Sequence, residues 1–162
     1  GNPVRRKVME QNTAYIMTSL LEGVVKHGTG RRVMALKRPV AGKTGTTNNL
    51  HDAWFVGYTP RYNTGTWVGY DEKRSLGKGE TGSRAASPIW VGFMQRLLAD
   101  KSVRVFQVPE GVVFSKIDAE TGLLPIPESK KTIFECFKEG TVPTEYTKKP
   151  NRANTTAFGC VM

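Results

Sequence analysis

The sequence has few cysteines and no long apolar run. Cys136 and Cys160 are its two cysteines, and neither has a second cysteine or a histidine nearby. This spacing excludes a local metal-binding motif and leaves both a single disulfide and two free thiols open. No apolar stretch approaches the roughly 18 to 20 residues that span a membrane, and Gly1 to Arg5 lack the apolar region of a signal peptide. We therefore expect no metal or cofactor, and we expect any anchor or export signal to lie outside this chain.

Acidic residues are scarce relative to basic ones. The chain has 24 Lys and Arg against 14 Asp and Glu, a net charge of +10. Nucleic acid, membrane headgroups and anionic wall polymer would all suit this charge, so a non-catalytic basic binding module is one interpretation. No RNP-type or zinc-finger pattern accompanies the charge, and we expect no nucleic-acid partner. The 38% hydrophobic content of the 162 residues is enough for a globular core.

Two segments have the periodicity of α-helices. Residues 12–27 form the first, with Asn12 as the expected N-cap and a glycine-rich end immediately after it. The second begins at Ser87, an N-cap followed by Pro88 at the first helical position. The apolar residues that define the two helices are Ile16, Leu20 and Val24 in the first, and Trp90, Phe93, Met94, Leu97 and Leu98 in the second.

Three segments between these helices have the character of strands. They are Arg38–Thr46, Ala53–Tyr58 and Thr66–Tyr70, and the last two, separated by turn-forming residues, predict an antiparallel hairpin. Residues 75–84 hold three glycines and predict an irregular loop. Helix, antiparallel strands and helix, without βαβ alternation, predict an α+β fold with helices on a sheet.

The composition changes after Lys101. Residues 102–147 are richer in Pro, Gly and β-branched residues, which predicts short strands and turns. We expect three parts: 1–101, 102–147 as a Pro- and Gly-rich extension, and 148–162 as a basic mobile tail. Examples of this composition are Phe106 to Pro109, Gly111 to Phe114 and Ile117 to Leu124.

The densest chemical signal is the segment 41–49, in which Lys43, Thr44, Gly45 and Thr46 stand at the end of a predicted strand. A cation and hydroxyls beside glycines can bind an anion and let another backbone approach closely. A phosphate-binding Walker loop is one alternative, but Lys37 stands where that motif needs its first glycine, and a strand rather than a helix follows. A plain hairpin turn is the other alternative.

The order of several short motifs resembles the transpeptidase domain of class A penicillin-binding proteins over residues 8–145. The Lys-Thr-Gly element is one of three motifs of these proteins and of class A β-lactamases; the others are Ser-x-x-Lys and a Ser-x-Asn type. The segments that carry the resemblance are 14–17, 28–30, 40–47, 52–60, 67–71, 80–82, 86–90, 117–118, 121–122, 137, 140–141 and 143–144.

This resemblance implies a fold, a reaction and roles for four residues. The fold is the C-terminal portion of the penicillin-binding transpeptidase and serine β-lactamase-like fold, incomplete without upstream sequence. The implied reaction is acyl transfer from a D-Ala-D-Ala stem peptide of peptidoglycan through a serine acyl-enzyme, with β-lactam antibiotics as inhibitors. Lys43 would supply positive potential, the hydroxyls of Thr44 and Thr46 would bind the terminal carboxylate, and the Thr46 N–H would be an oxyanion donor. Gly45 would leave room for the donor backbone.

Two of the three family motifs are missing from the chain. No Ser-x-Asn occurs, and Ser75 to Lys78 match Ser-x-x-Lys by letter inside a glycine-rich loop after the Lys-Thr-Gly element. The chemistry needs the serine and lysine one helical turn apart, which Gly77 and Gly79 oppose. We therefore expect both motifs in an upstream segment of the same protein, and we expect this chain alone to be inactive.

The resemblance also implies a setting and a nearest competitor. The parent would be an enzyme of the periplasm or the outer face of the cytoplasmic membrane, with an N-terminal glycosyltransferase domain. A class A β-lactamase-like hydrolase is the competing activity. The extension after residue 101 and the pattern from Trp54 to Pro60 favour the penicillin-binding proteins. Of Trp54 and Phe55, which could stack on a ligand, alternation along the strand places one or both in the core.

Overall fold

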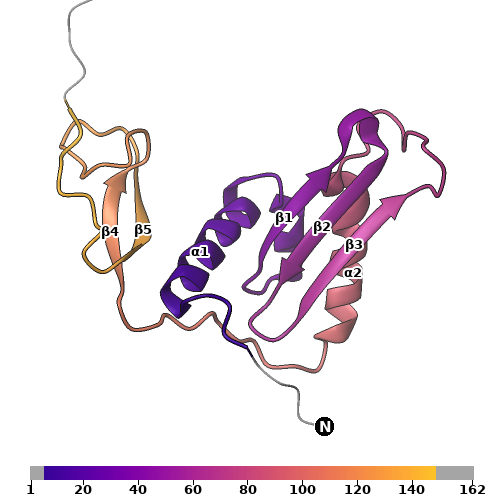
Figure 1. Cartoon of the computed structure of the whole chain (residues 1–162), viewed down its shortest axis with the longest axis horizontal. Helices are drawn as coiled ribbons and strands as arrows, with labels where there is room; N and C mark the ends of the chain where they lie inside the picture. Colours follow the sequence, from indigo (N-terminus) through magenta and orange to yellow (C-terminus); the bar gives the residue numbers. More distant parts are fainter. Residues whose placement is uncertain (1–5, 149–162) are drawn as a thin grey trace, which may run out of the picture. The chain divides into compact units, whose positions relative to one another are not determined.

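A computed structural model describes residues 6–148 (Figure 1). The chain divides into two compact units, unit 1 up to Glu110 and unit 2 from Gly111. This division falls later than the change in composition after Lys101. Of the predicted tail, 148–162, all but Lys148 lies outside the described residues.

Unit 1 contains a three-stranded antiparallel sheet in the order β1-β2-β3. Its strands are β1 (Ala41–Thr46), β2 (Asp52–Tyr58) and β3 (Asn63–Gly69), which confirms the predicted α+β arrangement and the hairpin. The start predicted for β3, Thr66, was wrong. The turn needs only residues 59–62, because the Thr59 N–H donates to the Tyr62 carbonyl (2.9 Å) and the Tyr62 N–H to the Thr59 hydroxyl (3.2 Å).

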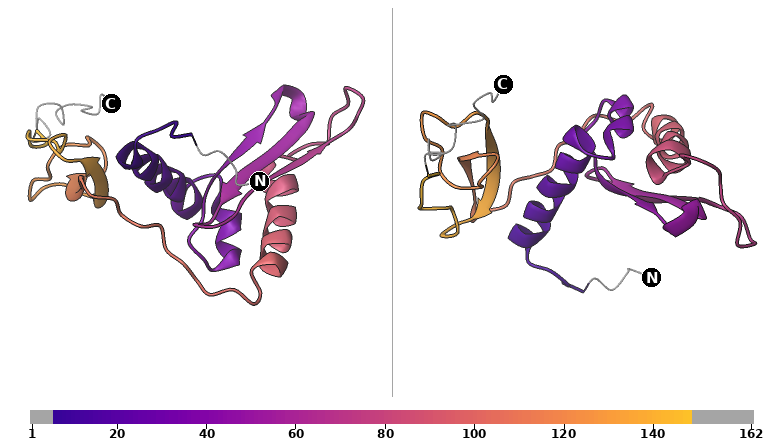
Figure 2. Two further views of the ribbon diagram at one scale, coloured as in Figure 1. Left: turned by 60° about the horizontal axis from the view of Figure 1, so that its bottom comes forward. Right: turned by 90° about the horizontal axis from the view of Figure 1, so that it is seen from above.

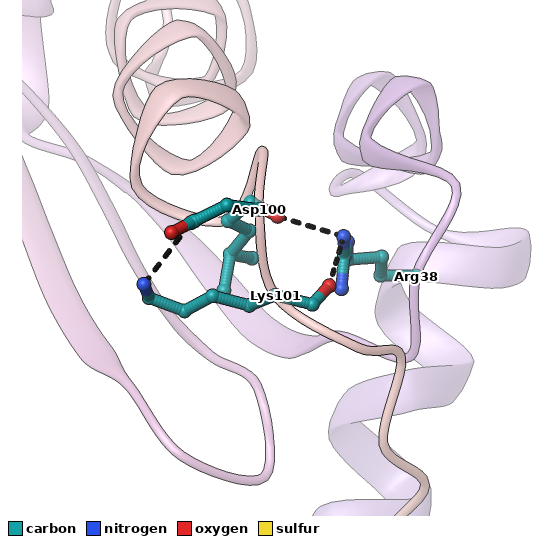
Figure 3. A network of polar contacts seen from close by, with 4 residues as sticks. Arg38, Asp100 and Lys101 are labelled. Carbon is teal, nitrogen blue, oxygen red and sulfur yellow. Dashed lines mark hydrogen bonds and ion pairs between the residues drawn. The ribbon is translucent and has the colours of Figure 1, made fainter.

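β1 also begins later than predicted, at Ala41 rather than Arg38. Pro39 has no N–H for a ladder, and the Arg38 guanidinium is engaged elsewhere. It donates to the carbonyls of Leu98 and Lys101, each at 2.8 Å, while the Lys101 ammonium contacts the Asp100 carboxylate at 3.1 Å (Figure 3). Arg38 thus adds hydrogen bonds to two carbonyls of the chain that follows the second helix.

The second helix, α2 (Ser87–Leu97), covers one face of the sheet. A π-helical turn, η3 (Gly82–Ala86), runs directly into it, so Ser87 is not an N-cap as predicted. The Ser87 hydroxyl instead donates to the Gly82 carbonyl at 3.1 Å and is buried. Trp90 and Met94 are fully buried, and the Trp90 ring meets Phe55 of β2 edge-on at 5.2 Å. Phe93, which was predicted on the same face, is 52% exposed.

The first helix, α1 (Gln11–His27), begins before the predicted cap, with Glu10 at the N-cap position. Its buried residues are Thr18 and Val25, whereas Leu20 of the apolar stripe is 53% exposed. The stripe therefore predicted the helix correctly but not its buried face. A 3-10 helix, η1 (Arg31–Leu36), follows and lies beside α2 (Figure 2). Its Val33 and Leu36 belong to the core.

Unit 2 is built on an antiparallel pair, β4 (Val112–Asp118) and β5 (Thr132–Lys138). Short strands were expected in this region: β4 overlaps 111–114 and the start of 117–124, and residues 106–109 are not in a strand. β5 was not predicted. Cys136 on β5 is buried with a free thiol, and Cys160 lies outside the described residues.

Candidate functional site

The segment Lys43 to Thr46 lies on an edge strand. β1 pairs with β2 on one side, and the order of the three strands leaves its other side without a strand among residues 6–148. Helix α1 lies beside the first part of β1, because Thr18 contacts Tyr58, the partner of Ala41, at 3.0 Å, and Thr29 contacts Thr44 at 2.8 Å (Figure 1). α1 ends just before Thr29, which contacts Thr44. Gly45 and Thr46 therefore lie beyond the end of the helix.

The hydrogen bond just after β1 shows to which side of the strand each backbone N–H points. The Thr47 N–H donates to the Asp52 carbonyl at 3.0 Å, so it points toward β2. Successive N–H groups of a strand point to opposite sides. The N–H groups of Thr46 and Thr44 therefore point away from β2, toward the open edge.

The side chains of the segment gather at this edge from both faces of the sheet. The Lys43 ammonium donates to the Thr44 carbonyl at 2.8 Å and lies 3.4 Å from the Thr44 hydroxyl. That hydroxyl lies 2.8 Å from the hydroxyl of Thr29. The structure thus places one ammonium and two hydroxyls together on the exposed surface, an arrangement suited to a carboxylate or another anion.

Thr46 is connected to the turn before α2. Its hydroxyl accepts a hydrogen bond from the Gly82 N–H at 3.0 Å and keeps its own proton for donation. Gly82 is buried, and a Cβ there would overlap the carbonyl oxygens of Trp54 and Gly45. Only glycine allows the turn to lie this close to the end of β1. Gly45 is constrained similarly, since a Cβ there would lie 3.2 Å from the Trp54 Cβ.

The loop after β1 is held by Asp52. The Asp52 N–H donates to the Thr47 hydroxyl (2.8 Å), and that hydroxyl in turn lies 3.2 Å from the Asp52 carboxylate. The indole N–H of Trp67 on β3 donates to the other carboxylate oxygen at 2.9 Å. These bonds connect all three strands at the end of the sheet where Thr46 lies.

The structure separates the two aromatic residues of β2. Phe55 is fully buried, whereas Trp54 is 43% exposed on the opposite face with its ring 6.3 Å from Trp67. One of the two residues is therefore in the core, as the alternation indicated.

The Ser-x-x-Lys letters at Ser75 to Lys78 do not form a helix. Gly77 and Gly79 have φ of 113° and 82°, and the Ser75 hydroxyl accepts the Gly77 N–H at 3.2 Å. Ser75 and Lys78 are therefore not one helical turn apart. The Walker interpretation also fails, because a short 3-10 turn, η2 (Asn48–Leu50), and then β2 follow the Gly42-Lys43-Thr44 segment.

Asp100 and Asp118, the two carboxyl groups with a lowered pKa, lie outside the segment Lys43 to Thr46. A hydrogen bond from Lys101 lowers the pKa of Asp100, and a hydrogen bond from Ser129, followed by the Glu120 N–H, lowers the pKa of Asp118. In the part of the chain that the structure describes, no group of His, Cys, Asp and Glu is arranged to hold a metal ion. None of the helices within 6–148 has the length and apolarity needed to cross a bilayer.

Comparison with known proteins gives the family. Residues 2–94 match the penicillin binding protein transpeptidase domain, and residues 108–152 match the C-terminal domain of penicillin-binding protein 1A. The chain therefore belongs to the penicillin-binding protein transpeptidase family. Within that family, the second match and the relatives below place it with the penicillin-binding protein 1A type.

Two curated relatives and one solved structure illustrate the similarity. The chain is 44% identical to penicillin-binding protein 1A of Pseudomonas aeruginosa (89% of this chain, 18% of the relative) and 39% identical to that of Aquifex aeolicus (87% and 19%). The crystal structure of penicillin-binding protein 1A from Haemophilus influenzae matches with a TM-score of 0.77 at 35% identity, covering 87% of this chain and 22% of that one. The chain thus spans about a fifth of the length of these proteins.

Three residues that contact the segment 41–49 were not predicted to do so. Thr29 was interpreted only as part of a helix end, Asp52 received no role, and Gly82 was treated as part of a structural loop. The sequence signals were their positions in the segments 28–30, 52–60 and 80–82 that carry the family resemblance. The contacts of Thr29 with Thr44 and of Gly82 with Thr46 join residues far apart in the chain, which local patterns do not report.

Proposed function

We propose that this chain is the Lys-Thr-Gly-Thr side of a serine-type D-Ala-D-Ala transpeptidase that cross-links peptidoglycan. The observation that carries the proposal is the open edge of β1, where outward N–H groups, two hydroxyls and one ammonium meet. An extended peptide can add to such an edge as a further strand, with backbone hydrogen bonds for affinity and side chains for specificity. A stem peptide ending in D-Ala-D-Ala, or a β-lactam that mimics it, fits this description.

Each residue of the segment has a physical role in this proposal. Lys43 supplies positive potential beside the reacting groups. The hydroxyls of Thr44 and Thr46 donate to the terminal carboxylate, because an ionised carboxylate only accepts hydrogen bonds. The outward N–H of Thr46 is one of two oxyanion donors. Gly45 lets the donor backbone approach.

The nucleophile and its base come from outside this chain. A serine and lysine in a Ser-x-x-Lys motif and a Ser-x-Asn motif belong to an upstream segment of the same protein, which would complete the acyl-enzyme pathway. The chain alone is inactive in this account. Exposed apolar side chains in unit 1, including Met17 and Leu20 on α1 and Trp54 and Val56 on β2, support a further packing partner for unit 1.

The wider setting is part of the proposal. The parent enzyme works in the periplasm or on the outer face of the bacterial cytoplasmic membrane, where peptidoglycan is assembled. It carries its membrane anchor and a glycosyltransferase domain outside this chain. Its partners are peptidoglycan stem peptides and β-lactam antibiotics.

The test is the rate of acylation by a fluorescent penicillin in the longer protein that carries the serine. Lys43→Ala and Thr44→Val should each slow acylation, Lys43→Ala on the order of hundreds-fold, the typical cost of removing one preorganised electrostatic group from an active site. Thr13→Val, at an exposed threonine of α1, is the control and should leave the rate unchanged. Wild-type rates in both site variants would exclude this segment from the reaction.

A further inference from the structure

The backbone on both sides of Thr29 is hydrogen-bonded to the last turn of α1. The N–H groups of Gly28 and Gly30 both donate to the Val24 carbonyl, at 3.0 and 3.1 Å. A Cβ at Gly28 would lie 3.0 Å from that carbonyl oxygen and 3.2 Å from the Val24 Cα. The two glycines therefore fold the chain closely against the last turn of α1. The Cα of Thr29, between them, is therefore held beside this turn.

The Thr29 side chain contacts the proposed site at the Thr44 hydroxyl. The Thr29 hydroxyl lies 2.8 Å from the Thr44 hydroxyl, and the Lys43 ammonium lies 3.4 Å from the same Thr44 oxygen. The geometry of the Thr29 contact allows either hydroxyl to donate. The ammonium can only donate, so it already uses one of the two lone pairs of Thr44.

Counting donors and acceptors at Thr44 shows what each direction of the bond with Thr29 leaves available to a ligand. A hydroxyl has one proton and two acceptor lone pairs. When Thr29 donates, Lys43 and Thr29 together use both lone pairs of Thr44, and the only remaining capacity of Thr44 is its proton. When Thr44 donates to Thr29 instead, that proton is no longer available to an anion.

We propose that Thr29 is a positioning residue that makes Thr44 a hydrogen-bond donor to the carboxylate of the acyl donor or antibiotic. The inference rests on the proposed function, in which Thr44 binds that carboxylate. Thr29 acts through Thr44 and contacts no reacting atom. The pair favours ligands with an ionised carboxylate at this point, because a charged acceptor binds the proton that Thr44 offers more strongly than a neutral one.

The experiment compares Thr29→Val with Thr29→Ser in the longer protein that carries the nucleophile. Two probes are used, benzylpenicillin and its methyl ester, in which the carboxylate is masked. Thr29→Val should lower the acylation rate constant for benzylpenicillin about three- to tenfold, the worth of one hydrogen bond. Thr29→Ser, which keeps the hydroxyl, should stay near wild type. The slower reaction of the ester, whose neutral carbonyl is a weaker acceptor, should differ much less among the three proteins.

A purely structural role for Thr29 gives different results. Equal slowing of both probes, wild-type rates in Thr29→Val, or a Thr29→Ser variant as slow as Thr29→Val would each overturn the inference. If Thr29→Val does not fold, as judged by its thermal unfolding midpoint, Thr29→Ala takes its place with the same expectations.

A double-mutant cycle separates this inference from the proposed function. In a Thr44→Val background the effect of Thr29→Val should vanish, because the contact has lost its partner. A Thr44→Val variant with wild-type acylation contradicts the proposed role of Thr44. A slow Thr44→Val variant beside a wild-type Thr29→Val variant contradicts only the role of Thr29.

Discussion

Units 1 and 2 are stabilised by different means. Unit 1 has a continuous apolar core in which Phe55, Trp90 and Met94 are fully buried between the sheet and α2. Unit 2 buries little more than Ile117 and Cys136 on its paired strands, and leaves Phe134 73% exposed. It depends more on polar contacts in its turns, above all on Asp118, whose carboxylate accepts the N–H groups of Glu120 and Thr121 at 2.8 and 3.2 Å.

The two units also differ in charge and in chemistry. Most of the excess positive charge lies in unit 1, while acidic and basic residues nearly balance in unit 2. The cluster at Lys43 to Thr46 is built on unit 1. A site that must hold hydroxyls and backbone donors in fixed directions benefits from the rigid core beneath it.

The largest expected effect comes from the core of unit 1. Phe55→Ala removes a fully buried ring that packs on Trp90 and should lower the free energy of unfolding of unit 1 by about 3 to 5 kcal/mol. The three tryptophans of the chain, at positions 54, 67 and 90, all lie in unit 1. Urea unfolding followed by tryptophan fluorescence therefore reports on this unit.

Two matched substitutions serve as controls for that prediction. Phe93→Ala on α2, where the ring is 52% exposed, and Phe134→Ala in unit 2 should each change the same transition by no more than about 0.5 kcal/mol. A Phe55→Ala transition within that range would show that the core is not organised as described.

A smaller effect is expected at the contact between the turn and the end of β1. Gly82→Ala places a methyl group against the carbonyls of Trp54 and Gly45 and should destabilise unit 1 by about 1 to 3 kcal/mol. It should also slow acylation in the longer protein, because the Gly82 N–H holds the Thr46 hydroxyl.

Gly92→Ala is the matched control. Gly92 lies within α2 with nothing within 4 Å of its Cβ position, so alanine should stabilise the helix by about 0.5 to 1 kcal/mol. Equal stability of the two alanine variants would refute the close packing at Gly82.

The smallest effect is a pH dependence that distinguishes the units. The Ser129 hydroxyl, followed by the Glu120 N–H, holds the pKa of Asp118 below its usual value. A carboxyl with a lowered folded-state pKa stabilises the fold above its unfolded pKa, near 3.9, and this contribution is lost as the pH falls through the folded value. Unit 2 should therefore lose protection of its β4 and β5 amides from hydrogen exchange below about pH 4.

Two variants sharpen that comparison. Asp118→Asn should weaken unit 2 at neutral pH and remove this part of its acid dependence. Asp100→Asn in unit 1, where Lys101 lowers the pKa of an exposed carboxyl, should change almost nothing because solvent screens the pair. Equal acid dependence in wild type and Asp118→Asn would contradict the role of Asp118.

The sequence predicted the elements of unit 1 well because their patterns are local. The spacing of Trp90, Met94 and Leu98 and the β-branched and aromatic residues of β2 indicate a helix and a strand without knowledge of the partners. Element ends were less accurate. Arg38 lies outside β1, with its guanidinium bound to carbonyls just after α2. Ser87 is not a cap because a π-helical turn precedes it.

The sequence located the candidate site but did not predict which residues of other elements contact it. Lys43 to Thr46 are consecutive in the chain, so a single sequence motif identifies all four. Their partners Thr29 and Gly82 come from separate elements, and these contacts depend on the tertiary fold, whereas Asp52 contacts the next residue, Thr47. The face of α1 that packs was also not predictable, since Leu20 and Val25 are equally apolar by type, yet only Val25 is buried.

The most direct test of the account is covalent labelling by a fluorescent penicillin. The labelled samples are the 162-residue chain and the same chain joined to its upstream sequence, compared on a denaturing gel. We expect no covalent label on the chain alone and a label on the joined protein that Lys43→Ala diminishes. Labelling of the chain alone, abolished by Ser75→Ala, would contradict the account.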